Sequence, residues 1–174
     1  MATHPVSNPE HCLEFDRRRE VRTPAHSAIA GNIYYEFRVR LPANGYHVYG
    51  PTLRVGLNSK ECSYPDATVV YGEVEYSDDG EDAISNPKIV VEVLSPTTKN
   101  NDLGPKLRLY WDVASLTDIL LIDQETVWIE YWFRTPGGEW KNCTLESLQE
   151  RLMIESAGCE IPVAEIYAGV EFSA

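Results

Sequence analysis

The sequence predicts an α/β domain with a mixed central sheet and helices on both sides. Three observations predict this fold class: an amphipathic helix precedes most of the strands, a second helix interrupts them, and the strand just before that second helix is almost wholly apolar. Strands, a crossover helix and further strands are typical of layered α/β architectures. The 174 residues suit one domain with a sizeable core, so we expect a flexible tail at residues 1–10 and a single domain at residues 11–174.

The first helix is expected to begin at or just after Pro24. Its apolar residues recur at every fourth position and therefore share one face, at Ile29, Ile33, Phe37 and Leu41. Pro42 and Gly45 then end it.

The strand at residues 88–94 is the strongest strand signal in the chain. Nearly every residue in it is apolar, as in strands that are buried on both faces. Val90, Glu92 and Leu94 share one of those faces. A carboxylate in such a strand is costly to bury unless it is paired or bound to a cation, so Glu92 is either a metal ligand or the partner of an arginine.

The remaining elements are weaker predictions. A short hairpin is expected around Arg17–Arg19. Strands are expected at residues 46–49, 52–57, 66–71, 117–122, 127–134 and 140–144, and helices at about 102–113 and at 162–167.

Composition narrows the function classes. A net charge of −12, from 27 acidic and 15 basic residues, argues against a broad non-specific grip on nucleic acid. It leaves room for a nuclease, because a metal site needs carboxylates and brings its own positive charge. Any phosphate-binding face is expected in the first third of the chain, where the arginines gather at Arg17, Arg18, Arg19, Arg22, Arg38, Arg40 and Arg54.

Membrane, secretory and zinc-binding roles find no support in the sequence. No apolar run is long enough to span a bilayer, and the polar start of the chain lacks a secretory signal, so we expect a cytoplasmic protein that does not bind membranes. The four cysteines are scattered without zinc spacing, which indicates free thiols.

A second acid lies at the start of another strand, in Tyr64-Pro65-Asp66. Taken alone, an aspartate after a proline is usually a turn or capping residue. Together with Glu92 it is more informative, because two carboxylates on adjoining strands can hold a hard cation such as Mg²⁺.

Longer motifs then resemble a known family. The pattern comprises Pro65-Asp66, the segment Val91-Glu-Val-Leu-Ser-Pro-Thr-Thr98, Asp102-Leu-Gly-Pro-Lys106 with Tyr110, Leu120–Asp123, and the segments 158–162 and 166–171. It resembles the Uma-type family of bacterial restriction-endonuclease-like proteins, over nearly the whole chain from about Glu14. His26 and Gly31-Asn32-Ile33 also fit the first helix of that family.

The resemblance implies a nuclease superfamily whose motif is Pro-Asp, a spacer, and then Glu-x-Lys. It implies a restriction-endonuclease-like fold, with Mg²⁺ or Mn²⁺ held by Asp66, Glu92 and the backbone carbonyl of Val93. The motif lysine is absent, since Leu94 occupies its position. The family pattern instead offers Lys106 on the following helix, and the other interpretation of Lys106 is an ordinary exposed helix lysine.

Further residues are weaker candidates for the same site. Glu14 fits an acid of the family's opening hairpin and is a possible third carboxylate. Ser95 and Thr97 are placed to donate hydrogen bonds to phosphate, and Asp102 shares a helix face with Lys106. His26 is a further candidate because it fits the first helix of the family.

The predicted function is metal-dependent hydrolysis of phosphodiester bonds in nucleic acid, with DNA favoured as the substrate. The alternative is a catalytically degenerate member of the fold that acts as a binding or assembly module, as the net charge and the displaced lysine suggest. A hydrolase with Ser95 or Cys62 as nucleophile has less support, because neither lies in a Gly-x-Ser-x-Gly turn.

A homodimer is also predicted. The segment 117–134 is apolar on both faces of a strand pair, more than one core requires, and an apolar surface left over could face a second copy. The alternative is a central strand pair that helices cover on both faces.

Overall fold

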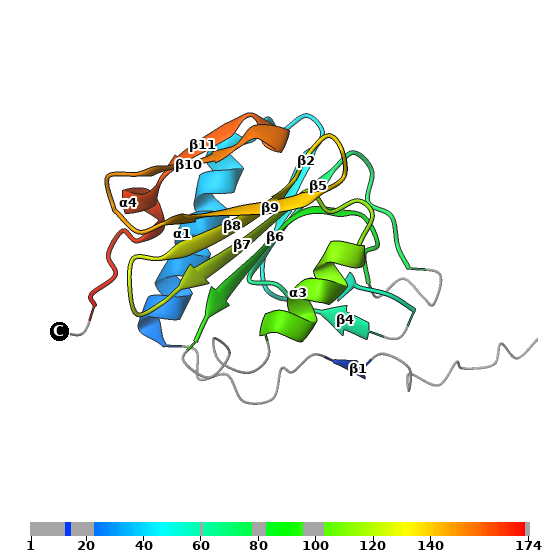
Figure 1. Cartoon of the computed structure of the whole chain (residues 1–174), viewed down its shortest axis with the longest axis horizontal. Coiled ribbons are helices and arrows are strands. Elements are labelled where there is room, and N and C mark those ends of the chain that lie inside the picture. Colours follow the sequence, from blue (N-terminus) through cyan, green and yellow to red (C-terminus); the bar gives the residue numbers. More distant parts are fainter. Residues whose placement is uncertain (1–12, 15–22, 60, 78–82, 96–102, 173–174) are drawn as a thin grey trace, which may run out of the picture.

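The computed structural model describes residues 13–14, 23–59, 61–77, 83–95 and 103–172. Its centre is a six-stranded mixed sheet with the order β2-β5-β6-β7-β8-β9 (Figure 1). The strands are β2 (Tyr46–Tyr49), β5 (Ala67–Tyr71), β6 (Pro87–Leu94), β7 (Asp118–Asp123), β8 (Ile129–Arg134) and β9 (Trp140–Leu145). Only the β6–β7 pair is parallel within this sheet. A parallel pair needs a crossover connection, and the segment that contains α3 (Leu103–Asp112) makes it.

Helices cover both faces of the sheet, as the sequence predicts. The helix α1 (Pro24–Arg40) lies on one face, and its buried residues pack in one cluster with Val91 and Val93. On the other face, α3 packs in a second cluster with Val90 and Leu94. Successive β6 residues therefore enter opposite layers, which accounts for the continuous apolar run of this strand.

The strand pair predicted to face a second copy is covered within the chain. In β7, Leu120 and Ile122 pack in the cluster under α1, whereas Ile119 and Leu121 pack in the cluster under α3. For β7 the structure therefore agrees with the alternative prediction, in which helices cover both faces of a central strand pair. The apolar pattern of β7 does not require a second copy of the chain. The homodimer itself stays a prediction.

Two smaller sheets complete the fold. In one, β1 (Leu13–Glu14), β4 (Glu61–Ser63) and β3 (Val55–Gly56) lie in the order β1-β4-β3. The other is the antiparallel hairpin of β10 (Arg151–Ile154) and β11 (Cys159–Pro162), joined through η1 (Glu155–Ala157). The last helix, α4 (Val163–Ile166), lies beside α1 in Figure 1.

Several sequence predictions need correction at these smaller sheets. The strand expected at residues 52–57 is only the two residues of β3, and the sequence analysis did not identify β4, β10 or β11. The predicted hairpin around Arg17–Arg19 lies outside the described residues except for β1, which pairs in parallel with β4. The predicted tail also lies outside them. Within the part of the chain that the structure describes, every helix is too short or too polar to cross a membrane.

Candidate functional site

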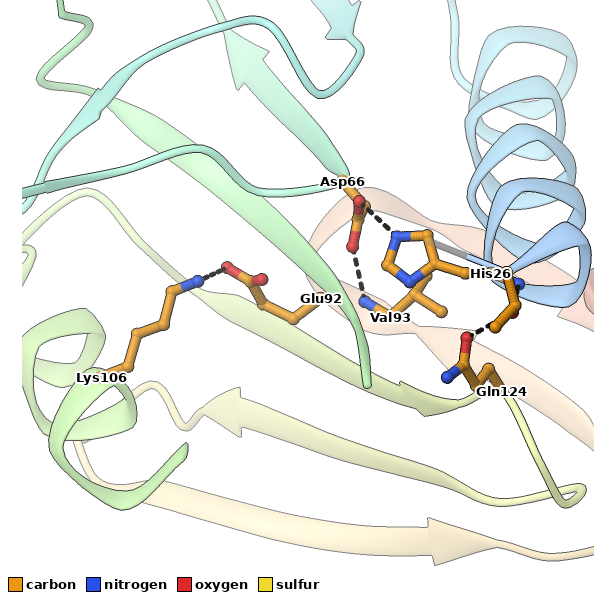
Figure 2. A network of polar contacts seen from close by, with 7 residues as sticks. His26, Asp66, Glu92, Val93, Lys106 and Gln124 are labelled. Atoms are coloured by element: carbon orange, nitrogen blue, oxygen red, sulfur yellow. Dashed lines mark hydrogen bonds and ion pairs between the residues drawn. The ribbon is translucent and has the colours of Figure 1, made fainter. Parts of the chain in front are cut away.

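Asp66 lies at the start of β5 with only 4% of its surface exposed. Its Oδ2 accepts a hydrogen bond from the backbone N–H of Val93 at 2.8 Å, and its Oδ1 lies 3.0 Å from Nε2 of His26 (Figure 2). Val93 directly follows Glu92 in β6. The first contact therefore holds the Asp66 carboxylate against the peptide that joins Glu92 to Val93.

His26 reaches Asp66 from the first turn of α1, and its position depends on the cap of that helix. The Thr23 hydroxyl oxygen accepts a hydrogen bond from the His26 backbone N–H at 3.1 Å and donates one to Gln124 Oε1 at 2.7 Å. Gln124 is buried just after β7. The start of α1 is thus tied to the end of a central strand, and His26 is only 1% exposed at that junction.

Glu92 projects toward α3, on the side of β6 away from His26 (Figure 2). Its Oε1 lies 2.7 Å from Nζ of Lys106 and accepts a hydrogen bond of 2.5 Å from the Tyr110 hydroxyl. That hydroxyl also lies 2.9 Å from Ser63 Oγ. A tyrosine has a single hydroxyl proton, so Ser63 must donate in the second bond. Burial, followed by the charge of Glu92, raises the pKa of Tyr110 well above its usual value, which keeps this donor protonated.

Lys106 owes its direction to the packing of α3. Leu107 and Tyr110 are buried, and Lys106, one turn before Tyr110, reaches Glu92 with 18% of its side chain exposed. Leu94, at the position of the motif lysine, is buried in the same apolar cluster. A lysine at position 94 would place its charge in that cluster, whereas Lys106 reaches Glu92 from the cluster's edge. The sequence offers a second lysine near Glu92, Lys99, in a polar loop where a long side chain is less fixed than on a helix, so Lys106 is expected to approach Glu92 more closely. Lys99 lies outside the described residues, and this comparison stays a prediction.

The other candidate residues separate into two groups. Ser95 is buried immediately after β6, next to the site. Thr97, Asp102 and the side chain of Glu14 lie outside the described residues. The contacts of the described residues give the Val93 carbonyl no role in the site, whereas the Val93 amide holds Asp66.

The donor set suits a hard divalent cation in type and number. Mg²⁺ binds in many proteins through one or two carboxylates and keeps several of its waters. The Asp66 carboxylate contacts the peptide that joins Glu92 to Val93. Glu92 Oε2 has no hydrogen bond or ion pair within the described part of the chain. In that same part, no three His, Cys, Asp or Glu side chains are grouped so that they could hold a metal ion. The described residues therefore offer two carboxylates, and water or substrate would have to supply the other ligands of any ion bound there.

Three polar residues escaped the sequence analysis. Thr23 and Gln124 are in contact because the start of α1 lies against the end of β7. The residues around either position do not predict this long-range contact. Ser63 lies in β4, which the sequence analysis missed. Tyr110 carried a signal, because it lies four residues after Lys106 and so shares its helix face.

Comparison with known proteins gives the family. A family model described as "Putative restriction endonuclease" (Uma2) matches residues 17–164. The chain belongs to this family. The match covers most of the chain and agrees with the resemblance carried by the motifs around Asp66 and Glu92.

Two proteins of Synechocystis sp. are similar to this chain over most of its length. The Synechocystis sp. protein slr1290 is 26% identical over 186 residues, which cover 98% of this chain and 96% of that protein. A second Synechocystis sp. protein, sll1609, is 25% identical over 142 residues, or 81% of this chain and 76% of that protein. The names of these two proteins state no activity.

A solved structure supports the fold. The crystal structure of an Anabaena variabilis protein, described as "a putative nuclease belonging to DUF820", superposes with a TM-score of 0.67 at 14% sequence identity and covers 88% of this chain and 86% of that one. Family and fold together make this Uma2 protein nuclease-like, with a restriction-endonuclease-like mixed sheet flanked by helices.

Proposed function

We propose that this Uma2 protein is a metal-dependent endonuclease that hydrolyses phosphodiester bonds of nucleic acid, with DNA as the favoured substrate. One observation carries the proposal: the Asp66 carboxylate is bonded to the amide next to Glu92, while Lys106 contacts Glu92 from the following helix. Two carboxylates and a lysine are the groups that the family motif combines, although the lysine here comes from α3 and not from β6.

Mg²⁺ or Mn²⁺ would be held by Asp66, Glu92 and the Val93 carbonyl, and it would supply a polarised phosphate and a water of lowered pKa. The chain's own residues do the positioning. His26 and the Val93 amide hold the Asp66 carboxylate in one orientation, and Tyr110 does the same for Glu92. Lys106 offsets negative charge beside the reacting phosphate and orients the attacking water.

The excess of acidic over basic residues in the chain favours weak, salt-sensitive binding of the substrate. With a net charge of −12, contacts to phosphate must be concentrated where the arginines lie in the sequence. The proposed location is the cytoplasm, and the proposed assembly is a homodimer. Light scattering of the purified protein at micromolar concentration tests the assembly, and a monomeric mass would contradict it.

A second candidate is a binding or assembly module with a degenerate centre. It is favoured by the Lys106–Glu92 ion pair, which already neutralises one of the two carboxylates at 2.7 Å. In this case the pair is a structural contact, and the protein would bind nucleic acid or protein without cleaving it.

Two variants distinguish these functions. Asp66→Asn should abolish binding of Mn²⁺ in isothermal titration, because it removes a charged ligand. Lys106→Ala should lower cleavage of plasmid DNA by at least about 100-fold and leave Mn²⁺ binding in place, because both carboxylates remain. Lys141→Ala is the matched control, since Lys141 is exposed on β9.

Other outcomes point elsewhere. Equal Mn²⁺ binding by the wild type and Asp66→Asn would contradict the metal site. Folded wild-type protein that cleaves neither DNA nor RNA with Mg²⁺ or Mn²⁺ would favour the binding module.

A further inference from the structure

A groove opens beside Asp66, on the α1 side of the sheet. It encloses about 400 Å³, within the range of roughly 300–1,000 Å³ that is usual for small-molecule sites. One wall is a stripe of α1, the other is the loop after β2, and Asp66 lies at its end. The lining residues are His26, Ser27, Ala30, Gly31, Tyr34, Gly50, Pro51 and Asp66.

Gly31 is the residue in this groove that the fold does not explain. A glycine inside a helix is destabilising relative to alanine, and it is usually kept for a positive φ or a close contact. Gly45 has such a φ, of 98°, and a Cβ on Gly56 would lie 2.7 Å from Ser77 Oγ. A Cβ on Gly31 would meet nothing within 4 Å.

Gly50, on the opposite wall, is equally unconstrained, since a Cβ there would also meet nothing within 4 Å. Both walls therefore carry a glycine that packing does not require. Both glycines line the groove, so a larger side chain at either position would extend into open space at its walls. The need for an open groove accounts for both glycines, whereas the stability of α1 would favour alanine at position 31.

The chemistry of the walls identifies the kind of occupant. The described lining residues include no lysine or arginine that could pair with a phosphate. Ala30 and Pro51 are apolar, and Tyr34 contributes a half-buried aromatic side chain. Nucleic-acid bases bind aromatic side chains by stacking, because every base has a π-face.

We propose that this groove binds one unstacked nucleobase of the substrate, next to the phosphodiester that lies at Asp66. This inference rests on the proposed nuclease function and names the form of its substrate. A base in a continuous duplex is stacked and paired and must be extruded before it can enter a pocket, whereas a base in a single strand or at a frayed end is free. The protein should therefore prefer single-stranded nucleic acid over duplex of the same composition.

The test measures binding and cleavage separately. Fluorescence anisotropy with a fluorescein-labelled oligonucleotide whose mixed sequence does not self-pair, in EDTA to prevent cleavage, reports the affinity for a single strand. A hairpin duplex of equal length and base composition is the comparison. The wild type should bind the single strand at least about tenfold more tightly than the hairpin, and Gly31→Leu should remove about tenfold of that affinity, as expected for the loss of one stacked base.

Variants and controls make the result specific. Gly31→Ala should raise the melting temperature and weaken binding less than leucine does. Val39→Leu is the matched control, because Val39 is 53% exposed on α1 and does not line the groove. If Gly31→Leu does not fold, Ser27→Leu, exposed on the same wall, takes its place and should lower the affinity in the same way.

The possible failures are distinguishable. Unchanged single-strand affinity in folded Gly31→Leu and Ser27→Leu would overturn the groove, as would equal affinity for hairpin and single strand. In both cases, the proposed nuclease function would still stand if the wild type cleaves nucleic acid and Asp66→Asn does not. A wild type that neither binds nor cleaves nucleic acid would overturn both proposals.

Discussion

Two buried acidic centres lie along the β6–β7 pair, and they are built in different ways. Asp66 and Glu92 are satisfied by a histidine, a backbone amide, a lysine and a tyrosine, and Asp66 also lines a groove. Asp118, at the start of β7, is wholly buried. Its carboxylate accepts hydrogen bonds from the hydroxyls of Tyr131 and Thr117, each at 2.6 Å, and from that of Ser156.

The difference shows that a buried carboxylate is not by itself a sign of function. Among the described residues, no lysine, arginine or histidine is paired with Asp118, and three hydroxyl donors enclose it. Ser156 belongs to η1, so this centre ties the β10–β11 hairpin to the main sheet. The Asp66–Glu92 centre instead has a cation of its own and a route to ligands. We therefore expect the Asp118 centre to serve stability, whereas the Asp66–Glu92 centre is the one to which the proposed function gives a chemical role.

The largest expected effect on stability comes from Asp118→Ala. The variant leaves the buried hydroxyl of Tyr131 without its acceptor, whereas Thr117 is half-buried and Ser156 is exposed, so both can turn to other partners. We expect unfolding to become easier by about 2–3 kcal/mol. Urea denaturation measures this loss. Mn²⁺ affinity of the folded fraction should remain that of the wild type, and a parallel loss of metal binding would break the division between the two centres.

Alkaline pH should affect both centres through their tyrosines. Burial raises the pKa of Tyr110, Tyr131 and Tyr167 above the usual value of about 10. The folded chain then keeps protons that the unfolded chain releases, so stability is fully present below pH 10 and falls above it. Each tyrosine contributes a slope of about 1.4 kcal/mol per pH unit.

Single substitutions assign that slope to the centres. Above pH 10, Tyr131→Phe should make the slope of the unfolding free energy against pH less steep by the contribution of one proton. This variant reports on the Asp118 centre. Tyr110→Phe should have the same effect and reports on the Glu92 centre. Urea denaturation at a series of pH values from 8 to about 11 gives the slope. An unchanged slope in both variants would mean that these hydroxyls ionise in the folded protein as freely as in the unfolded chain.

The smallest expected effect distinguishes repulsion from pairing at Glu92. From the sequence, crowded carboxylates would repel each other, so Glu92→Gln would stabilise the metal-free protein or leave it unchanged. The structure supports the opposite expectation, because Glu92 is paired with Lys106 and bonded to Tyr110. We expect a loss of about 1–2 kcal/mol in thermal or urea unfolding.

A double-mutant cycle sharpens this result. Lys106→Met combined with Glu92→Gln should cost less than the sum of the two single changes, because each removes the same contact. Glu125→Gln, at an exposed position, is the control. A gain of stability in Glu92→Gln would show that repulsion from Asp66 outweighs the ion pair.

Most of the central fold could be predicted because its signals are periodic and long. The apolar spacing of residues 24–41 predicts α1, and the apolar run at residues 88–94 predicts β6 and its two covered faces. The short strands β3, β4, β10 and β11 have two to four residues each, too few for a period to be recognised. Their pairing partners, not their own residues, make them strands.

By itself, the sequence determined that two carboxylates lie on adjoining strands and that a helix carrying Lys106 follows the second of them. It also determined the family, through motifs that extend over nearly the whole chain. These properties are local, because they depend on residue order, spacing and strand alternation.

Only the tertiary structure decided where the side chains point. Asp66 turns to His26, 40 positions away in sequence, and the helix that carries His26 is held by Gln124, 101 positions from Thr23. Glu92 turns the other way, to Lys106, and the groove forms where α1 passes the loop after β2. A side chain takes the direction in which its hydrogen bonds are satisfied, and here the partners come from segments that only the packing of the sheet brings together.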